Sequence, residues 1–206
     1  MPFSLTNGPT VLQRFMNNIF TDMLDVCMVI YLDDILIYFN DSTSPKLHVK
    51  EVFQQLQLHN LFTQEDKCEF HQTIVEFLGY ILSLEDLTMG EEKVKGIQDW
   101  PEPWKVQDIQ AFLSFTNFYQ CFIHNYSRIT IPLTRLTHKG MPWDFSQDCR
   151  QAFKSLKKAF TMAPILMHWL PDCPLLVETD ASNYALTAIL SLQTSDGKIH
   201  PIAFHS

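Results

Sequence analysis

Basic residues are scarce in this sequence. The 206 residues include 15 Lys and Arg against 23 Asp and Glu, and residues 1–100 alone hold 6 against 15. Proteins that bind phosphate backbones usually carry a basic stripe. The composition therefore argues against tight nucleic-acid binding by the isolated chain, so a role on nucleic acid has to be inferred from motifs.

Paired cysteines and long apolar runs are also missing. The 5 cysteines are widely spaced without a CxxC pair, which argues against a disulfide framework or a zinc ribbon and indicates an intracellular location, in the cytoplasm or the nucleus. The longest apolar run, residues 26–32, is far below the ~18 residues needed to span a bilayer. The amino terminus has neither the basic region nor the apolar core of a secretion signal, so we expect no secretion and no membrane partner.

The residues that are present suffice for a folded core, since 46% are hydrophobic and 18% charged. Apolar residues recur every three or four positions from Val11 to Leu24, which predicts one long helix with Thr10 as its cap. A second helix is expected after a Ser/Thr/Pro loop at residues 42–45. The residues on its buried face are Val49, Val52, Phe53 and Leu56.

Two aspartates stand between these helices. The short apolar runs 26–31 and 35–39 flank Asp33 and Asp34, and they predict a buried hairpin with both carboxylates at its tip. Like charges a few ångströms apart oppose each other's ionisation, and a divalent cation removes that cost. With a third carboxylate from elsewhere, the pair would hold the two metal ions of an in-line nucleotidyl transfer. The alternative is that the aspartates only fill a tight turn.

The rest of the sequence predicts a second hairpin, a proline linker, two helices and three strands. They are expected, in this order, at residues 67–83, 100–104, 106–123, 146–160, 175–179, 184–192 and 199–204. Ser146 is the expected cap of the second of these helices. The last strand has no terminator, so we expect its domain to be cut short.

A series of short motifs runs through the whole chain in a fixed order. They are MPFSLTNGP at 1–9, QRF at 13–15, YLDD at 31–34, KCEF at 67–70, FLGY at 77–80, FLSFTNFY at 112–119, PLT at 132–134 and VETDAS at 177–182. In this order they resemble the palm of a reverse transcriptase and, more narrowly, the reverse transcriptase and ribonuclease H region of a gypsy-type LTR retrotransposon polyprotein.

The resemblance implies roles for residues in the polymerase motifs. Asp33 and Asp34 correspond to two of the three catalytic metal ligands of the polymerase, with Asp33 the more critical. Phe3 and Ser4 would lie against the incoming nucleotide. Lys67 corresponds to a lysine thought to protonate the leaving pyrophosphate, with an ordinary exposed lysine as the alternative.

Two further assignments follow from the later motifs. Leu78, Gly79 and Tyr80 would form the hairpin that positions the 3′ end of the primer. Asp180 would be the first metal ligand of the ribonuclease H domain, on that domain's first strand.

The sequence also departs from the family pattern. Polar side chains replace glycine at Ser4, Asp86, Ser114 and Thr187. Because glycine at such places typically permits positive φ or close backbone approach, we expect strain at these positions. The family's fingers and first catalytic aspartate precede the MPF motif and are not in this sequence. Together these departures suggest a decaying or repurposed element.

We therefore expect an α+β chain that contains part of a polymerase palm at residues 1–90, thumb and connection helices at 91–145, and the first strands of a ribonuclease H-like domain at 146–206. The implied function is that of a reverse transcriptase fragment whose parent enzyme uses Mg²⁺ or Mn²⁺. Its implied partners are an RNA/DNA primer-template, deoxynucleotides and the rest of the polyprotein. The alternative is a catalytically inactive remnant or a domesticated interaction domain, and whether this chain is itself an enzyme stays open.

Overall fold

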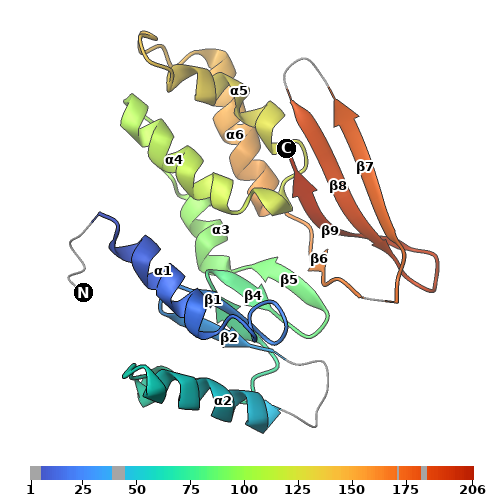
Figure 1. Ribbon diagram of the computed structural model, residues 1–206. Coiled ribbons are helices and arrows are strands. Elements are labelled where there is room, and N and C mark those ends of the chain that lie inside the picture. The colour runs from blue at the N-terminus through green and yellow to red at the C-terminus, as the bar shows by residue number, and fades with distance from the viewer. Residues whose placement is uncertain (1–5, 39–44, 171, 182–184) are drawn as a thin grey trace. The chain divides into compact units, whose positions relative to one another are not determined.

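The computed structural model describes residues 6–38, 45–170, 172–181 and 185–206, which fold into helices and antiparallel sheets (Figure 1). Two units follow each other along the chain, Met1–Gln72 and Thr73–Ser206. Each unit has its own cluster of buried apolar side chains. The mixture of helices with antiparallel sheets confirms the predicted α+β class.

The first unit consists of a helix, a hairpin and a second helix. Its elements are α1 (Gly8–Ile19), β1 (Met28–Tyr31), β2 (Asp34–Ile37), α2 (Pro45–Leu58) and the short 3-10 helix η1 (Glu65–Lys67). Strands β1 and β2 pair in antiparallel register, with Tyr31 opposite Asp34, so the turn between them contains only two residues. The predicted hairpin is confirmed.

Helix α1 is shorter than the apolar periodicity predicts. It ends at Ile19, but Met23 beyond it is still buried. The apolar stripe continues because the turns after the helix also face the core, so periodicity here reports burial rather than helix length. The helix begins directly after Asn7, so Thr10 lies inside it and is not its cap.

Helix α2 completes the core of the first unit. Val52 and Leu56 are buried as predicted, whereas Phe53 is 39% exposed. The buried residues of α2 share one cluster with α1, the hairpin and the turns before it. The members of this cluster are Met16, Phe20, Met23, Cys27, Met28, Ile30, Val52 and Leu56. The hairpin therefore has one face anchored in an apolar core.

A four-stranded antiparallel sheet opens the second unit. Its strands, in spatial order, are β3 (Val75–Phe77), β4 (Tyr80–Leu82), β5 (Asp86–Met89) and β6 (Leu166–Met167). The β3–β4 hairpin confirms the second predicted hairpin, although its strands begin later than residue 67. The sequence does not predict β6, because a strand of 2 residues that pairs with a distant segment has no local signature.

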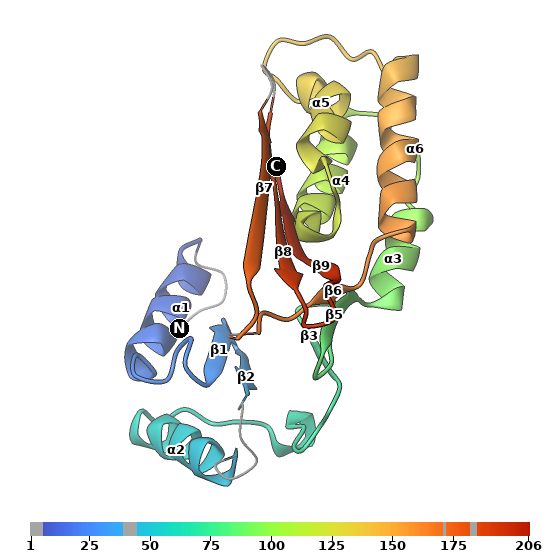
Figure 2. The same cartoon turned by 90° about the vertical axis from the view of Figure 1, so that its right-hand side faces the viewer.

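Four helices pack together in the second unit (Figure 2). They are α3 (Glu91–Gln98), α4 (Val106–Phe118), α5 (Tyr126–Leu136) and α6 (Gln147–Thr161), with the 3-10 helix η2 (Gln120–Phe122) after α4. Phe112, Leu133 and Leu156 from three of these helices are fully buried in one cluster. As predicted, Ser146 caps α6, where its hydroxyl accepts a hydrogen bond from the backbone N–H of Cys149 at 3.5 Å.

The resemblance implies helices within residues 91–145, but the residue pattern does not predict where α3 and α5 lie. Helix α5 contains Pro132 and follows Asn125, which has a left-handed φ of 57° and makes no side-chain cap. Both features normally mark a break rather than a helix. The predicted helix over residues 106–123 ends at Phe118, where η2 takes over.

The last three strands form a separate antiparallel sheet in the order β7–β8–β9. They span Leu175–Ala181, Leu186–Gln193 and Ile199–His205, close to the predicted positions. The backbone N–H of Ser127 in α5 donates to the hydroxyl of Ser206 at 2.9 Å. The His124 ring stacks on Phe204 with 5.6 Å between centroids. These two contacts connect β9 and the residue after it to the helices.

Within the described ranges, the structure contains no helix long and apolar enough to cross a lipid bilayer.

Candidate functional site

The tip of the first hairpin carries both predicted metal ligands. Leu32 and Asp33 form the two-residue turn, and Asp34 is the first residue of β2. Leu32 has a left-handed φ of 55°, which a branched side chain rarely adopts. Asp33 and Asp34 are both exposed. The hairpin thus presents two adjacent carboxylates to solvent.

The sequence predicts a buried hairpin tip, and this prediction is wrong, because both carboxylates are exposed. Water screens the repulsion between exposed charges far more strongly than a protein interior does. The pair therefore needs no cation to be tolerated, and a role in metal binding rests on their placement rather than on relief of strain.

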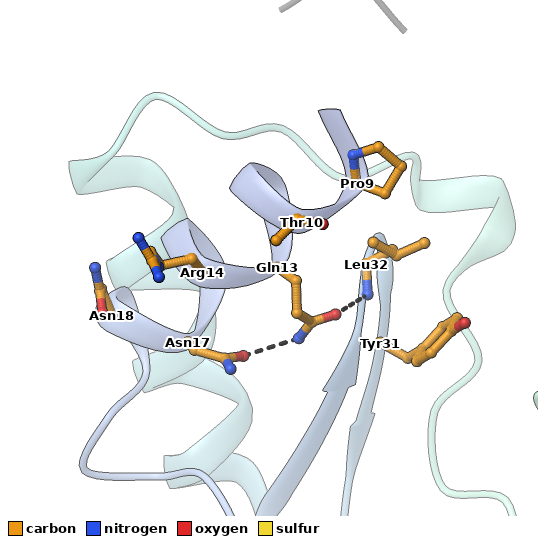
Figure 3. A pocket seen from close by; sticks show the side chains of 8 residues that line it. All are labelled: Pro9, Thr10, Gln13, Arg14, Asn17, Asn18, Tyr31 and Leu32. Carbon is orange, nitrogen blue, oxygen red and sulfur yellow. Dashed lines mark hydrogen bonds between the residues drawn. The ribbon is translucent and has the colours of Figure 1, made fainter. Parts of the chain in front are cut away.

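The side chain of Gln13 in α1 holds this turn (Figure 3). Its Oε1 accepts a hydrogen bond from the backbone N–H of Leu32 at 2.7 Å. Its Nε2 donates to the carbonyl oxygen of Ile30 at 3.1 Å. The same amide nitrogen also donates to Oδ1 of Asn17 at 2.8 Å. The helix and the hairpin tip are therefore joined by one side chain.

A shallow cavity of about 570 Å³ lies beside the turn. Its lining combines apolar surface with several polar side chains from α1, among them that of Arg14. The lining residues, shown in Figure 3, are Pro9, Thr10, Gln13, Arg14, Asn17, Asn18, Tyr31 and Leu32. Asp33 and Asp34 follow Leu32 in the chain and do not line this cavity.

Among the described residues, no group of three or more His, Cys, Asp or Glu side chains is arranged to hold a metal ion. Asp33 and Asp34 therefore offer two carboxylates. Oxygen ligands of this kind suit Mg²⁺ and Mn²⁺, which keep several waters or substrate oxygens in their coordination shell. The two carboxylates therefore fit a divalent cation whose coordination shell is completed by other ligands.

The predicted primer-binding residues form a second tight turn, in the second unit. Leu78 and Gly79 connect β3 to β4 with φ values of 55° and 79°, as a two-residue hairpin turn with two left-handed residues requires. The hydroxyl of Tyr119 donates to the carbonyl oxygen of Leu78 at 3.4 Å. The backbone N–H of Gly90 donates to the carbonyl oxygen of Gly79 at 3.1 Å. The turn is therefore fixed by residues that follow it in the chain.

Tyr80 belongs to an aromatic cluster rather than to an open surface. Its ring lies 5.6 Å from that of Phe118, 5.2 Å from Tyr119 and 5.8 Å from Phe122, measured between centroids. Burial, followed by interactions with Cys121 and Tyr119, raises the pKa of the Tyr80 hydroxyl. Burial and then the charge of Glu76 likewise raise the pKa of Tyr119. Both hydroxyls thus remain hydrogen-bond donors well above neutral pH.

The other predicted site residues lie elsewhere. Lys67 is exposed at the end of η1. Asp180 is exposed in β7, opposite Thr187, whose hydroxyl donates to the Asp180 carbonyl oxygen at 3.3 Å. Phe3 and Ser4 lie outside the described residues.

A left-handed backbone, one of the two expected sources of strain at the replaced glycines, is not found at three of the four positions. Asp86, Ser114 and Thr187 are not among the left-handed residues that the described part of the chain contains. Asp86 begins β5, where its backbone N–H donates to the hydroxyl of Ser83 at 3.0 Å. Ordinary helix or strand conformations accept these side chains without strain. The fourth position, Ser4, lies outside the described residues.

Gln13 belongs to the QRF motif, but the motif implies no role for it. The helical spacing places Gln13 on α1, but only the fold shows that its amide reaches a turn 19 residues later. A glutamine among apolar neighbours at helical spacing was the only available signal.

Comparisons with known proteins agree with this geometry. Residues 1–82 match the reverse transcriptase (RNA-dependent DNA polymerase) family, and residues 145–206 match the RNase H-like domain found in reverse transcriptase. A foamy viral protease-reverse transcriptase solved with an RNA/DNA hybrid superposes with a TM-score of 0.73 at 22% identity, over 99% of this chain and 27% of the other. The foamy viral protease-reverse transcriptase solved with dsDNA superposes with a TM-score of 0.72 at 22% identity, over 100% of this chain and 42% of the other. The fold is that of a reverse transcriptase region.

The curated relatives narrow this class. The chain is 34% identical to the Transposon Tf2-3 and Tf2-4 polyproteins of Schizosaccharomyces pombe over 206 residues, which are 100% of this chain and 16% of each relative. These similarities support a reverse transcriptase and ribonuclease H-like segment of a retrotransposon polyprotein. These matches do not favour the alternative of a domesticated interaction domain. The chain spans only a small part of the curated relatives that it matches.

Proposed function

We propose that this chain serves RNA-directed DNA synthesis in a gypsy-type retrotransposon polyprotein, with Asp33 and Asp34 as ligands of the polymerase metal ions. The observation that carries the proposal is the exposed carboxylate pair at a two-residue turn, in a region that matches the reverse transcriptase family. Mg²⁺ or Mn²⁺ bound there would activate the primer hydroxyl and stabilise the leaving pyrophosphate. The role of this chain would be to hold the two carboxylates at the tip of the first hairpin.

The remaining site residues are proposed in the roles that the resemblance implies. Leu78, Gly79 and Tyr80 would position the primer, the first two through the backbone of their turn, because the Tyr80 side chain is engaged in the aromatic cluster. Asp180 would bind metal in the ribonuclease H-like domain. Its exposure in β7 is compatible with that role.

Two other assignments follow from the motifs. Phe3 and Ser4 are proposed to contact the incoming nucleotide on the motif alone, since they lie outside the described residues. Lys67 is proposed as a proton donor to pyrophosphate, and its exposure is equally compatible with an ordinary surface lysine.

The proposed partners are an RNA/DNA primer-template, deoxynucleotides and the rest of the polyprotein. In this assignment residues 1–90 contribute to the palm, 91–145 to the thumb and connection, and 146–206 to the ribonuclease H-like domain. A formal net charge of −8 leaves little attraction for phosphate, so most of the nucleic-acid affinity would come from the remainder of the polyprotein.

Primer extension by the parent polyprotein tests the proposal. Asp33→Asn should abolish extension of a DNA primer on an RNA template, because the side chain keeps its size but loses its charge. The matched control is Asp22→Asn, another exposed aspartate of the first unit, which should leave extension unchanged. Extension that survives Asp33→Asn would contradict the metal role of this pair.

A further inference from the structure

The turn that carries Asp33 is held in a disfavoured conformation. Leu32, at its first position, has a φ of 55°, a region that β- or γ-branched side chains enter only when their surroundings impose it. A turn of this kind relaxes when its restraints are removed. The residue immediately after Leu32 is the proposed metal ligand, so any relaxation would redirect that carboxylate.

The restraint comes from one amide side chain in α1. The N–H of Leu32 can only donate, so it requires the oxygen of Gln13, at 2.7 Å. The carbonyl of Ile30 can only accept, so it requires the Gln13 nitrogen, at 3.1 Å. These two contacts fix which way the amide faces. They also pin the backbone on both sides of Tyr31, directly before the turn.

Gln13 is itself fixed from two directions. Its nitrogen donates to Oδ1 of Asn17, one helical turn further along α1, at 2.8 Å. The helix is anchored beside the hairpin through the buried side chains of Met16 and Phe20, which share a cluster with Met28 and Ile30. The core thus sets the position of α1, and α1 sets the position of the amide.

We propose that Gln13 is a positioning residue for the proposed metal site, which holds the left-handed turn at Leu32 so that Asp33 and Asp34 present their carboxylates together to a divalent cation. This inference rests on the proposed function of the two aspartates. Gln13 is uncharged and would not touch the metal. It would raise the metal affinity only by holding the two aspartates in place.

The test uses the 206-residue chain, with Mn²⁺ alone as the probe. Amide hydrogen exchange at Leu32 reports whether the turn is held, and Mn²⁺-induced NMR broadening around Asp33 and Asp34 reports metal affinity. In Gln13→Ala we expect faster exchange at Leu32 and about three- to tenfold weaker Mn²⁺ binding, because a neutral hydrogen bond that fixes a ligand contributes about that factor. The matched control is Gln57→Ala, an exposed glutamine of α2, which should change neither.

A second variant separates positioning from general loss of structure. Gln13→Glu keeps an oxygen for the Leu32 N–H but has no N–H for the Ile30 carbonyl. Its Leu32 amide should exchange more slowly than in Gln13→Ala, and its Mn²⁺ affinity should be closer to that of the parent. Unchanged Mn²⁺ affinity in Gln13→Ala overturns the positioning role. The absence of broadening at Asp33 and Asp34 in the parent chain refutes the proposed metal site itself. The exchange data then show that the Gln13 hydrogen bonds serve the turn structure alone.

Discussion

The hydroxyl of Tyr80 donates a 2.9 Å hydrogen bond to the backbone carbonyl oxygen of Phe118, at the end of α4. The two residues are 38 positions apart in the sequence. The first residue of β4 is thereby attached to a helix of the same unit, so the turn before β4 owes its placement to the helices that follow it.

Removing this hydroxyl should weaken the second unit. Tyr80→Phe keeps the ring packed against Phe118 and Phe122 but loses the hydrogen bond, so we expect a loss of about 1 kcal/mol in the free energy of unfolding. Tyr80→Leu, which also loses the aromatic contacts, should lose more. Urea denaturation of the three chains measures both steps. Equal stability of Tyr80→Phe and the parent would mean that water replaces the bond without cost.

Tyr80 should also make the stability of the second unit depend on pH in the alkaline range. Burial raises the pKa of Tyr80 above its ordinary value of 10.0, so the folded protein disfavours the ionised form. The corresponding stability is complete below the unfolded pKa and is lost as pH rises towards the folded value. Between about pH 8 and about pH 10.5, the parent should lose more stability than Tyr80→Phe does. Parallel pH profiles of the two chains would contradict this prediction.

Gly79 should not tolerate a side chain. Its φ of 79° already disfavours any Cβ, and a Cβ built there would clash with the Tyr119 hydroxyl oxygen and lie 2.8 Å from Cε of Lys93. We expect Gly79→Ala to cost about 2–3 kcal/mol, since backbone strain and displacement of Tyr119 add together. The measurement is the midpoint and slope of urea unfolding.

Gly140 provides the matched control for this substitution. It has a similar φ of 85°, but an added Cβ would meet no heavy atom within 4 Å. Gly140→Ala should therefore cost only about 1 kcal/mol, the share due to backbone strain. If both substitutions cost the same, the space around Gly79 is not restrictive and the close approach of Tyr119 has no energetic role.

Neutralising the aspartate pair should leave the fold intact. Because Asp33 and Asp34 are exposed, we expect Asp33→Asn/Asp34→Asn to stay within ~0.5 kcal/mol of the parent without metal. Mn²⁺ should raise the melting temperature of the parent slightly and that of the double variant not at all, because only the parent binds it in the folded state. A clearly destabilised double variant would instead support the alternative that these residues fill a tight turn.

The elements that sequence reasoning predicts well are those with a complete local signature. The hairpin around Asp33 is one, because two apolar runs flank polar residues, and the Ser146 cap is another. The helix around Pro132 and the strand at Leu166 are not predictable in this way. Their stability comes from burial of Leu133 and Leu166 in a core assembled from distant segments.

In the candidate site, too, some features have a local signature in the sequence and others depend on the packing of distant segments. The motif order locates Asp33 and Asp34, and the structure adds that they are exposed. Neither the left-handed φ of Leu32 nor the amide contact of Gln13 can be inferred from a pattern, because both depend on how α1 packs beside the hairpin. The left-handed φ expected at Asp86, Ser114 and Thr187 is not found, because a polar residue in place of glycine does not reveal the local φ.

The hydrogen bond from the Ser127 N–H to the Ser206 hydroxyl makes one end of α5 depend on a residue 79 positions later. Asn125 makes no side-chain cap, so this hydroxyl satisfies a backbone donor of the helix's first turn that has no partner within the helix. During synthesis α5 emerges long before β9, and its first turn therefore lacks this partner until the last strand has docked. Protection of the Ser127 amide would thus act as a late marker of folding in the second unit.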